Sequence, residues 1–346
     1  MSWLKRAEKR NGKYQNPVPT SVGGLRTMWK VLPLYVSNRE ETEPREPLGP
    51  FVTDPRVYDT PPASGLRVTW FGHSSLLLEI DGLRVLIDPV WERRASPVQF
   101  AGPARFYPPT LALGDLPELD CVLVSHDHYD HFGASTLRQL ARSKAASRAL
   151  WVTSAGVGRR LEKLGVEQRR IAALDWLESA AVQGGSDDAG LRVTALPARH
   201  FSGRSLWDRF STLWSSFVLE GPRHRVFFGA DSGYWEGFRE IGEQYGPFDL
   251  TMLEIGAFHP LWADIHMGPE GAARAYEAMG GPERCGPLFP VHWALFNLAL
   301  HGWRQPMEEM CRLASERGIP LWYPAPGAPA EVVRGNLVQV PWWQKP

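Results

Sequence analysis

The sequence feature that most constrains the fold is Ser125–His131, a stretch of seven residues of which five are His or Asp. It directly follows Cys121–Val124, a short apolar run that is typical of a buried strand. The strand therefore ends by presenting imidazole and carboxylate groups, the ligands that zinc prefers where no thiolate is available. The alternative, a polar loop that happens to be rich in His, is disfavoured because three of the chain's ten His lie within six positions.

The spacing within this stretch predicts two cation sites. In an extended segment, side chains two positions apart point to the same side. His126 and His128 are therefore expected to approach one cation together. Asp130 and His131, at the turn into the next helix, are expected to approach a second cation.

Three later apolar strands are also expected to end at a possible metal ligand, namely His200, Asp231 and His292. In layered α/β proteins, binding sites gather where loops leave the ends of the strands. A carboxylate suits a bridging position because its two oxygens can face two cations about 3.5–4 Å apart. The predicted arrangement places the first cation on His126, His128 and His200 and the second on Asp130, His131 and His292, with Asp231 bridging.

These ligands predict hydrolysis by metal-bound hydroxide, because the chain lacks a Gly-x-Ser-x-Gly nucleophile elbow and a P-loop. Two divalent ions carry four positive charges, and Asp130, Asp231 and a bridging hydroxide offset three, leaving about one. Such a site attracts an anionic group such as a phosphodiester. Two Zn²⁺ ions are the expected cofactors, since zinc brings the pKa of bound water to about 7. Iron or manganese would fit the same nitrogen and oxygen ligands.

Composition narrows the class of protein further. Lys+Arg and Asp+Glu number 38 each, so the chain lacks the excess of basic residues that is typical of nucleic-acid-binding proteins. The three cysteines lack CxxC spacing and are typical of reduced thiols in a cytoplasmic protein. No apolar run reaches the roughly 18–20 residues of a spanning helix, and the N-terminus lacks the apolar segment of a signal peptide. We expect a cytoplasmic protein whose membrane contact, if any, is peripheral; a homodimer is one option for its oligomeric state.

Two regions differ in their sequence pattern. Residues 1–65 are rich in Pro, Arg and Glu, which predicts an N-terminal arm wrapping a folded body, with a short helix around Leu25–Val31. From Leu66 onward, apolar strands alternate with amphipathic helices, which predicts a single domain of the α/β class over residues 66–346. One of its helices is expected over Ala134–Ala146.

Four further residues are candidates for roles around the site. His73 either holds a metal ligand in place through a hydrogen bond or is a hydrogen-bonded core residue. Trp207, Phe210 and Trp214 are spaced three and four apart, as one face of a helix requires, which predicts contact with substrate or membrane. An internal packing stripe is the alternative for these aromatic residues.

The ordered motifs resemble the metallo-β-lactamase superfamily. They are the HxHxDH segment, the later His200, the turn Gly229-Ala-Asp231-Ser-Gly233 and the pair His292-Trp293. The resemblance implies an αββα sandwich, in which two mixed β-sheets lie inside, helices lie outside and a dinuclear metal site lies at one edge. It also implies zinc ligation by the seven residues assigned above.

Further motifs resemble the family of N-acylphosphatidylethanolamine-hydrolysing phospholipase D. The similarity covers roughly residues 10–325 and includes Arg10–Pro19, Trp70–His73, Leu86–Pro89, Arg94–Pro97, Gly102–Phe106 and Gly246–Asp249. It implies a phosphodiesterase that cleaves a phospholipid to phosphatidate and an N-acylethanolamine. It also implies a catalytic role for His266 beside Asp130. The chain departs from the animal pattern at Arg199-His200-Phe201, where that pattern has Gln-His-Trp, and at Asp264-Ile265, where it has an aromatic residue and Gln.

Three functional hypotheses follow. The first is a dinuclear zinc phosphodiesterase of the phospholipase D type, acting on a phospholipid or another anionic diester. The second is a soluble lactonase or sugar-phosphate hydrolase on the same scaffold, and the third is a metal-binding regulatory protein without turnover.

Overall fold

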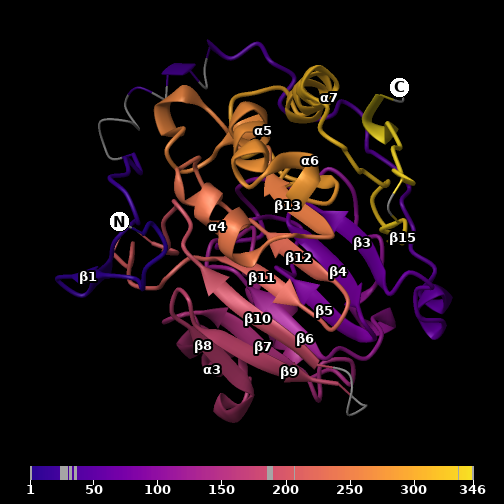
Figure 1. The fold of residues 1–346 in the computed structure, drawn as a ribbon. Helices are drawn as coiled ribbons and strands as arrows, with labels where there is room; N and C mark the ends of the chain where they lie inside the picture. The colour runs from indigo at the N-terminus through magenta and orange to yellow at the C-terminus, as the bar shows by residue number, and fades with distance from the viewer. Residues whose placement is uncertain are drawn as a thin grey trace.

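The computed structural model describes residues 2–23, 30, 33–34, 37–184, 190–205, 207–333 and 335–344. Among these residues, two mixed β-sheets pack face to face (Figure 1). The first sheet has the strand order β15-β3-β4-β5-β6-β7-β8. Its strands are β3 (Leu66–Gly72), β4 (Ser75–Ile80), β5 (Leu83–Ile87), β6 (Cys121–Val124), β7 (Leu150–Ser154), β8 (Ile171–Leu174) and β15 (Ala330–Glu331).

The second sheet has the strand order β14-β13-β12-β11-β10-β9. Its strands are β9 (Ser179–Gln183), β10 (Gly190–Leu196), β11 (Ser216–Glu220), β12 (Arg225–Phe228), β13 (Leu250–Glu254) and β14 (Leu288–Val291). Each sheet combines parallel and antiparallel pairs: β5 to β8 run parallel in the first sheet, and β12 to β14 run parallel in the second. Parallel neighbours bring the carboxyl ends of these strands to one edge, where the site forms.

Helices cover the outer faces of both sheets (Figure 1). On the second sheet, α5 contacts β13 and packs against α4, α6 and α7, whereas α3 lies next to β8 of the first sheet. The described helices are α2 (Ala134–Ala141), α3 (Gly158–Leu164), α4 (Gly237–Tyr245), α5 (Gly268–Ala278), α6 (Gly281–Arg284) and α7 (Gln305–Arg317). The layers are those of the predicted αββα sandwich, and this prediction is confirmed.

Strand β6 shows how the sequence builds these layers. Its four residues are apolar and fully buried. Because side chains alternate along a strand, Leu123 packs between the two sheets, whereas Val122 and Val124 pack on the outer side with Leu137 of α2. A strand that is apolar on both faces is what a parallel strand at the centre of a layered protein requires. The strand therefore fixes the position from which the HxHxDH stretch starts.

The structure differs from the sequence prediction at one helix and one strand. Helix α2 ends at Ala141 rather than at Ala146, because the Ser143 and Ser147 hydroxyls bond local carbonyl oxygens and favour turns. Strand β9 was not predicted from the sequence, since only Val182 of its five residues is buried and the apolar pattern is weak. The predicted helix around Leu25–Val31 lies outside the described residues.

The N-terminal region contacts the rest of the chain at several points. Tyr14 is buried against Trp176 and Trp214, and the Lys13 ammonium donates to the Arg209 carbonyl oxygen at 2.7 Å. Farther along, the Thr53 hydroxyl donates to the Gly327 carbonyl oxygen at 2.7 Å. These contacts attach the described parts of the N-terminal region to the body of the chain. The domain boundary at residue 65 stays a prediction.

Candidate metal centre

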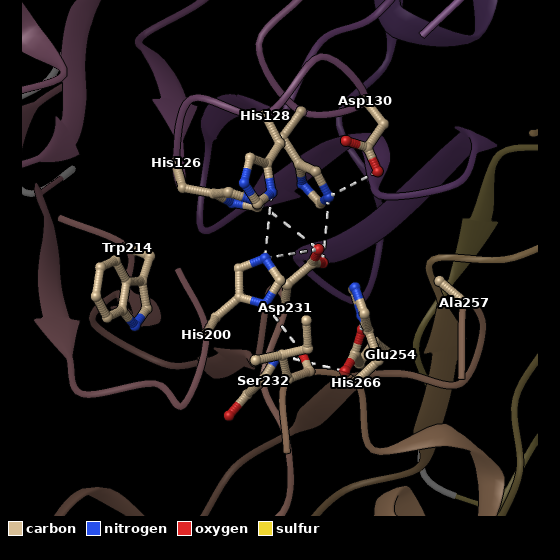
Figure 2. Close-up of polar contacts among 12 residues, drawn as sticks. His126, His128, Asp130, His200, Trp214, Asp231, Ser232, Glu254, Ala257 and His266 are labelled. Carbon is tan, nitrogen blue, oxygen red and sulfur yellow. Dashed lines mark hydrogen bonds and ion pairs between the residues drawn. The ribbon is translucent and has the colours of Figure 1, made fainter. Parts of the chain in front are cut away.

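The seven predicted ligands meet at one edge of the sandwich (Figure 2). They leave the ends of four strands: the HxHxDH residues follow β6, His200 follows β10, Asp231 follows β12 and His292 follows β14. Figure 2 shows Asp231 between the HxHxDH side chains on one side and His200 and His266 on the other. Their ligand atoms form two groups, in each of which all atoms lie within 4.8 Å of one another: His126, His128, His200 and Asp231; and His73, Asp130, His131 and His292.

The first group is dominated by imidazoles. The Nε2 atoms of His126 and His200 lie 3.0 Å and 3.2 Å from Nδ1 of His128. Oδ2 of Asp231 lies 3.8 Å from Nε2 of His126 and 3.6 Å from Nε2 of His200. Asp127, in the middle of the stretch, points away and accepts a hydrogen bond from Arg160 at 2.8 Å, as the strand-like alternation requires.

The second group is dominated by contacts between imidazoles and carboxylates. Oδ2 of Asp130 lies 2.9 Å from Nε2 of His73, 3.3 Å from Nε2 of His292 and 3.6 Å from Nε2 of His131. Asp231 joins the two groups, because its Oδ1 lies 3.2 Å from Nε2 of His131 and its Oδ2 lies 3.1 Å from Nε2 of His292. This position between the groups is the one predicted for a bridging carboxylate.

In the first group, hydrogen bonds fix the tautomers of His126 and His200. As a result, Nε2 of each ring carries a lone pair that faces Nδ1 of His128. Nδ1 of His200 must donate to the Ile265 carbonyl oxygen, 2.9 Å away. The Ser125 hydroxyl donates to Asp88, so it accepts from Nδ1 of His126 at 2.9 Å. Both Nε2 atoms therefore carry lone pairs, and the single Nδ1–H of a neutral His128 can satisfy only one of them. A cation among the three nitrogens would satisfy all of them.

The second group contains buried polar atoms without hydrogen-bond partners. They are Nδ1 of His73 and Nδ1 of His292. Nε2 of His131, Nε2 of His292 and Oδ1 of the neighbouring Asp231 also lack a well-aligned hydrogen bond, although both rings lie within ion-pair distance of Asp231. Unpaired buried polar atoms are rare in proteins because each costs about 1–3 kcal/mol. The donor set and these orphaned atoms fit a second cation.

The pKa values of four histidines shift in opposite directions: those of His126 and His200 in the first group are lowered, and those of His131 and His292 in the second group are raised. Burial and the neighbouring imidazoles lower the pKa of His126 well below its ordinary value. Burial also lowers the pKa of His200, although Asp231 acts in the opposite direction. For His292, burial opposes protonation, but the carboxylates of Asp231 and Asp130 outweigh it and raise the pKa to about 10. The pKa of His131 is raised well above its ordinary value in the same way, against burial, by Asp231, Asp130 and Asp88.

His73 lies inside the site rather than in a remote part of the core. It is 1% exposed, and its ring centroid is 3.9 Å from that of His292. Burial, together with the positive charge on His292, lowers the pKa of His73 to about 3, so its neutral Nε2–H donates to Asp130. Of the two roles considered from the sequence, the geometry matches the one in which His73 holds a ligand.

Strained backbone surrounds the ligands. His73, Asp88, Ala230 and His292 have φ angles of 55°, 41°, 48° and 63°. Non-glycine residues in this region cost about 1–3 kcal/mol each and persist only where the surroundings fix them. One such constraint is visible: the His292 amide donates to the His73 carbonyl oxygen at 3.0 Å. This strain is concentrated next to the predicted ligands, as is common at functional sites.

Asp88 is a site residue that the sequence analysis missed. Its Oδ2 accepts hydrogen bonds from Nδ1 of His131 and from the Ser125 hydroxyl, both at 2.7 Å. Through Ser125, Asp88 also orients His126, so one buried carboxylate holds a ligand of each group. The available signal was its position directly after the apolar strand β5, the same pattern that located the ligands.

Glu254 is a second missed residue. It is fully buried at the end of β13, and its Oε2 lies 2.7 Å from Nδ1 of His266. Burial raises the pKa of Glu254, although the charge on His266 acts against this. With Asp231 and His292, these two residues form a third group whose ligand atoms lie within 4.8 Å of one another. The signal was again a carboxylate that ends an apolar strand.

The described residues do not form the helix on which the predicted aromatic face depends, and contact with substrate or membrane stays a prediction. The described residues from Trp207 to Trp214 form turns and bends, because Asp208 accepts hydrogen bonds from the backbone N–H groups of Arg204 and Ser205, which competes with helix formation. Trp207 is 90% exposed, whereas Trp214 is 1% exposed and donates to the Ala198 carbonyl oxygen at 2.9 Å. Of these aromatic side chains, only Trp207 is free to contact another surface.

Two of the residues that depart from the animal phospholipase pattern form an ion pair. Arg199 and Asp264 lie 2.8 Å apart, although they are far apart in sequence. Each residue is close to a site histidine, His200 in one case and His266 in the other. The Asp264 carboxylate also accepts a hydrogen bond from the Ser21 amide at 2.9 Å. The pair therefore links the loops that carry both histidines to the N-terminal region.

Comparisons with known proteins agree with this site. A family described as the beta-lactamase superfamily domain matches residues 83–293. The chain is 42% identical over 341 residues to an uncharacterized protein of Mycobacterium tuberculosis, which covers 97% of this chain and 87% of that protein. It is 32% identical over 305 residues to N-acyl-phosphatidylethanolamine-hydrolyzing phospholipase D 1 of Caenorhabditis elegans, with coverage of 84% and 83%.

A solved structure supports the fold. Igni18, a metallo hydrolase from the archaeon Ignicoccus hospitalis, superposes with a TM-score of 0.57 at 21% identity, over 77% of this chain and 97% of that chain. The chain therefore belongs to the metallo-β-lactamase superfamily, as the motifs predicted. Within this superfamily it is a metal-dependent hydrolase with buried His/Asp clusters for divalent ions. In the part of the chain that the structure describes, no helix has the length and apolarity needed to cross a bilayer.

Proposed function

We propose that the chain is a dinuclear zinc phosphodiesterase of the phospholipase D type, which cleaves an N-acylphosphatidylethanolamine-like lipid to phosphatidate and an N-acylethanolamine. The observation that carries the proposal is the pair of donor groups that share Asp231. The phospholipase D of Caenorhabditis elegans, at 32% identity, supports the choice of substrate. Zinc fits the imidazole-rich donors, and iron or manganese would fit the same set.

The residues of the chain have distinct roles in this proposal. His126, His128 and His200 would hold one ion, Asp130, His131 and His292 would hold the other, and Asp231 would contact both. When bound, the ions would lower the pKa of water and stabilise negative charge on phosphate oxygens.

The charge balance of the site favours a diester. Two divalent ions would carry four positive charges, and the carboxylates of Asp130 and Asp231 offset two of them. Both carboxylates are ionised, because the imidazoles of His131 and His292 hold their pKa values well below the ordinary range against the effect of burial. The remaining positive charge attracts the single negative charge of a phosphodiester.

Two features near the site fit an amphipathic substrate. His266 is half-buried, and its ring centroid lies 5.0 Å from that of His200 and 5.1 Å from that of His292. It can therefore contact a substrate that spans both donor groups. Trp207, at the tip of a loop anchored beside Asp127, is 90% exposed, and an exposed indole suits the interface of a membrane.

The proposal is tested with zinc-loaded protein and vesicles that contain N-acylphosphatidylethanolamine. The expected products are phosphatidate and N-acylethanolamine in equal amounts, measured by mass spectrometry. Trp207→Ser should reduce turnover on vesicles and leave turnover of a water-soluble phosphodiester unchanged. Absence of phosphatidate at every zinc concentration would refute the lipid substrate, and turnover restricted to lactones or sugar phosphates would favour the alternative hydrolase.

A further inference from the structure

Glu254 has a role that the metal ligands do not explain. Its carboxylate is buried within the protein at the end of β13. Oε2 lies 2.7 Å from Nδ1 of His266, whereas Oε1 accepts from the backbone amides of Met267 at 2.9 Å and Ser232 at 3.3 Å. Burial of a carboxylate is unfavourable unless hydrogen bonds compensate it, and both oxygens of Glu254 have such partners.

These contacts distinguish Glu254 from a metal ligand. Its atoms lie close enough to those of Asp231, His266 and His292 for a shared cation. However, buried atoms without hydrogen-bond partners occur on Asp231, His131 and His292, and none occurs on Glu254 or His266. Glu254 is therefore directed at the imidazole of His266 and at the backbone, whereas the atoms without hydrogen-bond partners belong to Asp231, His131 and His292.

The contact with Glu254 leaves one nitrogen of His266 free for the substrate. Because Nδ1 donates to Glu254, Nε2 of the neutral ring is a hydrogen-bond acceptor. The His266 side chain is 13% exposed, whereas that of Glu254 is fully buried. Figure 2 shows the two residues together, on the side of Asp231 opposite His126 and His128.

We propose that Glu254 is a positioning residue that fixes the tautomer and the ring orientation of His266, so that Nε2 accepts a hydrogen bond from an N–H or O–H group of the substrate. The role in turnover rests on the proposed hydrolase function. The tautomer itself is a property of the folded chain and does not depend on that function.

Glu254→Gln provides a sharp test, because the surroundings dictate how the amide must lie. Two backbone N–H groups, from Met267 and Ser232, face the site of Oε1. The amide oxygen must occupy that site, since an NH₂ group there would oppose two donors. The NH₂ group then faces Nδ1 of His266. The imidazole proton must move to Nε2, which turns the acceptor facing the substrate into a donor.

The tautomer is measured by ¹⁵N NMR on protein labelled at histidine, both metal-free and zinc-loaded, at a mildly alkaline pH. The His266 signals are assigned by their loss in His266→Asn. We expect the Nδ1–H tautomer in the unmodified chain and the Nε2–H tautomer in Glu254→Gln. An Nε2–H tautomer in the unmodified chain, or the same tautomer in both proteins, would overturn the proposal.

The second test measures kcat/KM on the diester substrate. Glu254→Gln should lower kcat/KM by about 10–100-fold, the usual effect of losing an orienting partner. His266→Ala should abolish any further effect of Glu254→Gln, because residues that act through one another are not additive. Fully additive losses would contradict a role through His266.

Glu79→Gln is the matched control. Glu79 is a buried carboxylate, 3% exposed, that pairs with Arg67 at 2.5 Å on the first sheet. Its substitution should lower thermal stability and leave kcat/KM and the His266 tautomer unchanged. An equal loss of activity in Glu79→Gln would show that any buried carboxylate matters, which would also overturn the proposal. If the chain cleaves no diester, the NMR result still decides the Glu254–His266 contact.

Discussion

The two donor groups of the metal centre are held by different means. In the first group, neutral hydrogen-bond acceptors, the Ile265 carbonyl and the Ser125 hydroxyl, fix His200 and His126. In the second group, carboxylates surround the imidazoles, and Asp88 fixes His131. The first group therefore presents free lone pairs in the metal-free chain, whereas the second holds protons where a cation would bind.

This difference shows how one site can bind two ions of the same element unequally. Burial keeps the first group neutral and ready to coordinate. The carboxylates of the second group attract a cation strongly, but they attract protons as well. We therefore expect the first group to fill at lower metal concentration near neutral pH, and the second to be the more sensitive to acid.

The largest effect is expected from Asp231→Asn, which removes the charge that both groups share. Both ions should bind more weakly, and activity should fall by about 10³-fold or more, because metal stabilisation of the transition state contributes several kcal/mol. Metal content is measured by mass spectrometry alongside turnover. Asp59→Asn, at an exposed position, is the control. Retention of two metal equivalents by Asp231→Asn would contradict the shared role.

A smaller effect is expected from the residues that orient the ligands, and it should divide the two groups. Ser125→Ala removes the hydroxyl that bonds His126 and leaves the direct contact between Asp88 and His131 in place, whereas Asp88→Asn disturbs His131 directly and, through Ser125, His126 as well. Each change should weaken metal binding by about 10–100-fold, at one site for Ser125→Ala and at both for Asp88→Asn. Competition with a chromogenic chelator measures each step. Equal weakening of metal binding at both sites by Ser125→Ala would contradict the expected difference between the two groups.

The smallest effect is a difference in proton release. The raised pKa values of His131 and His292 mean that both rings are protonated at pH 7 in the metal-free chain and must lose these protons to bind a cation. Filling the second group should release about two protons, and its affinity should fall as the pH falls. Calorimetry in buffers of different ionisation enthalpy counts these protons. If protons were released only with the first equivalent of metal, their assignment to His131 and His292 of the second group would be wrong.

The sequence predicted the ligand set because the relevant signals are local. A short apolar run predicts a buried strand, and the alternation of side chains along an extended segment separates His126 and His128 from Asp127. The same pattern of a polar residue after an apolar strand located His200, Asp231 and His292. Asp88 and Glu254 fit the same pattern, since each is a carboxylate at the end of an apolar strand.

Other features depend on contacts between distant parts of the chain. Whether His73 meets Asp130, and whether Arg199 pairs with Asp264, depends on how strands and loops from different parts of the chain are brought together. Trp214 shows the same dependence, since its helical spacing from Trp207 is local, whereas its burial against Trp176 is a property of the assembled fold.

The sequence by itself determined the chemistry available to this protein: the donor types, their order along the chain and the strand ends that carry them. Only the tertiary structure decided which donors share a cation position, which residues orient them and which tautomers they adopt. The physical reason is the distance along the chain over which each effect acts. Side-chain alternation acts over two residues, whereas the distances of about 3 Å that define coordination and hydrogen bonding are set by the packing of two sheets.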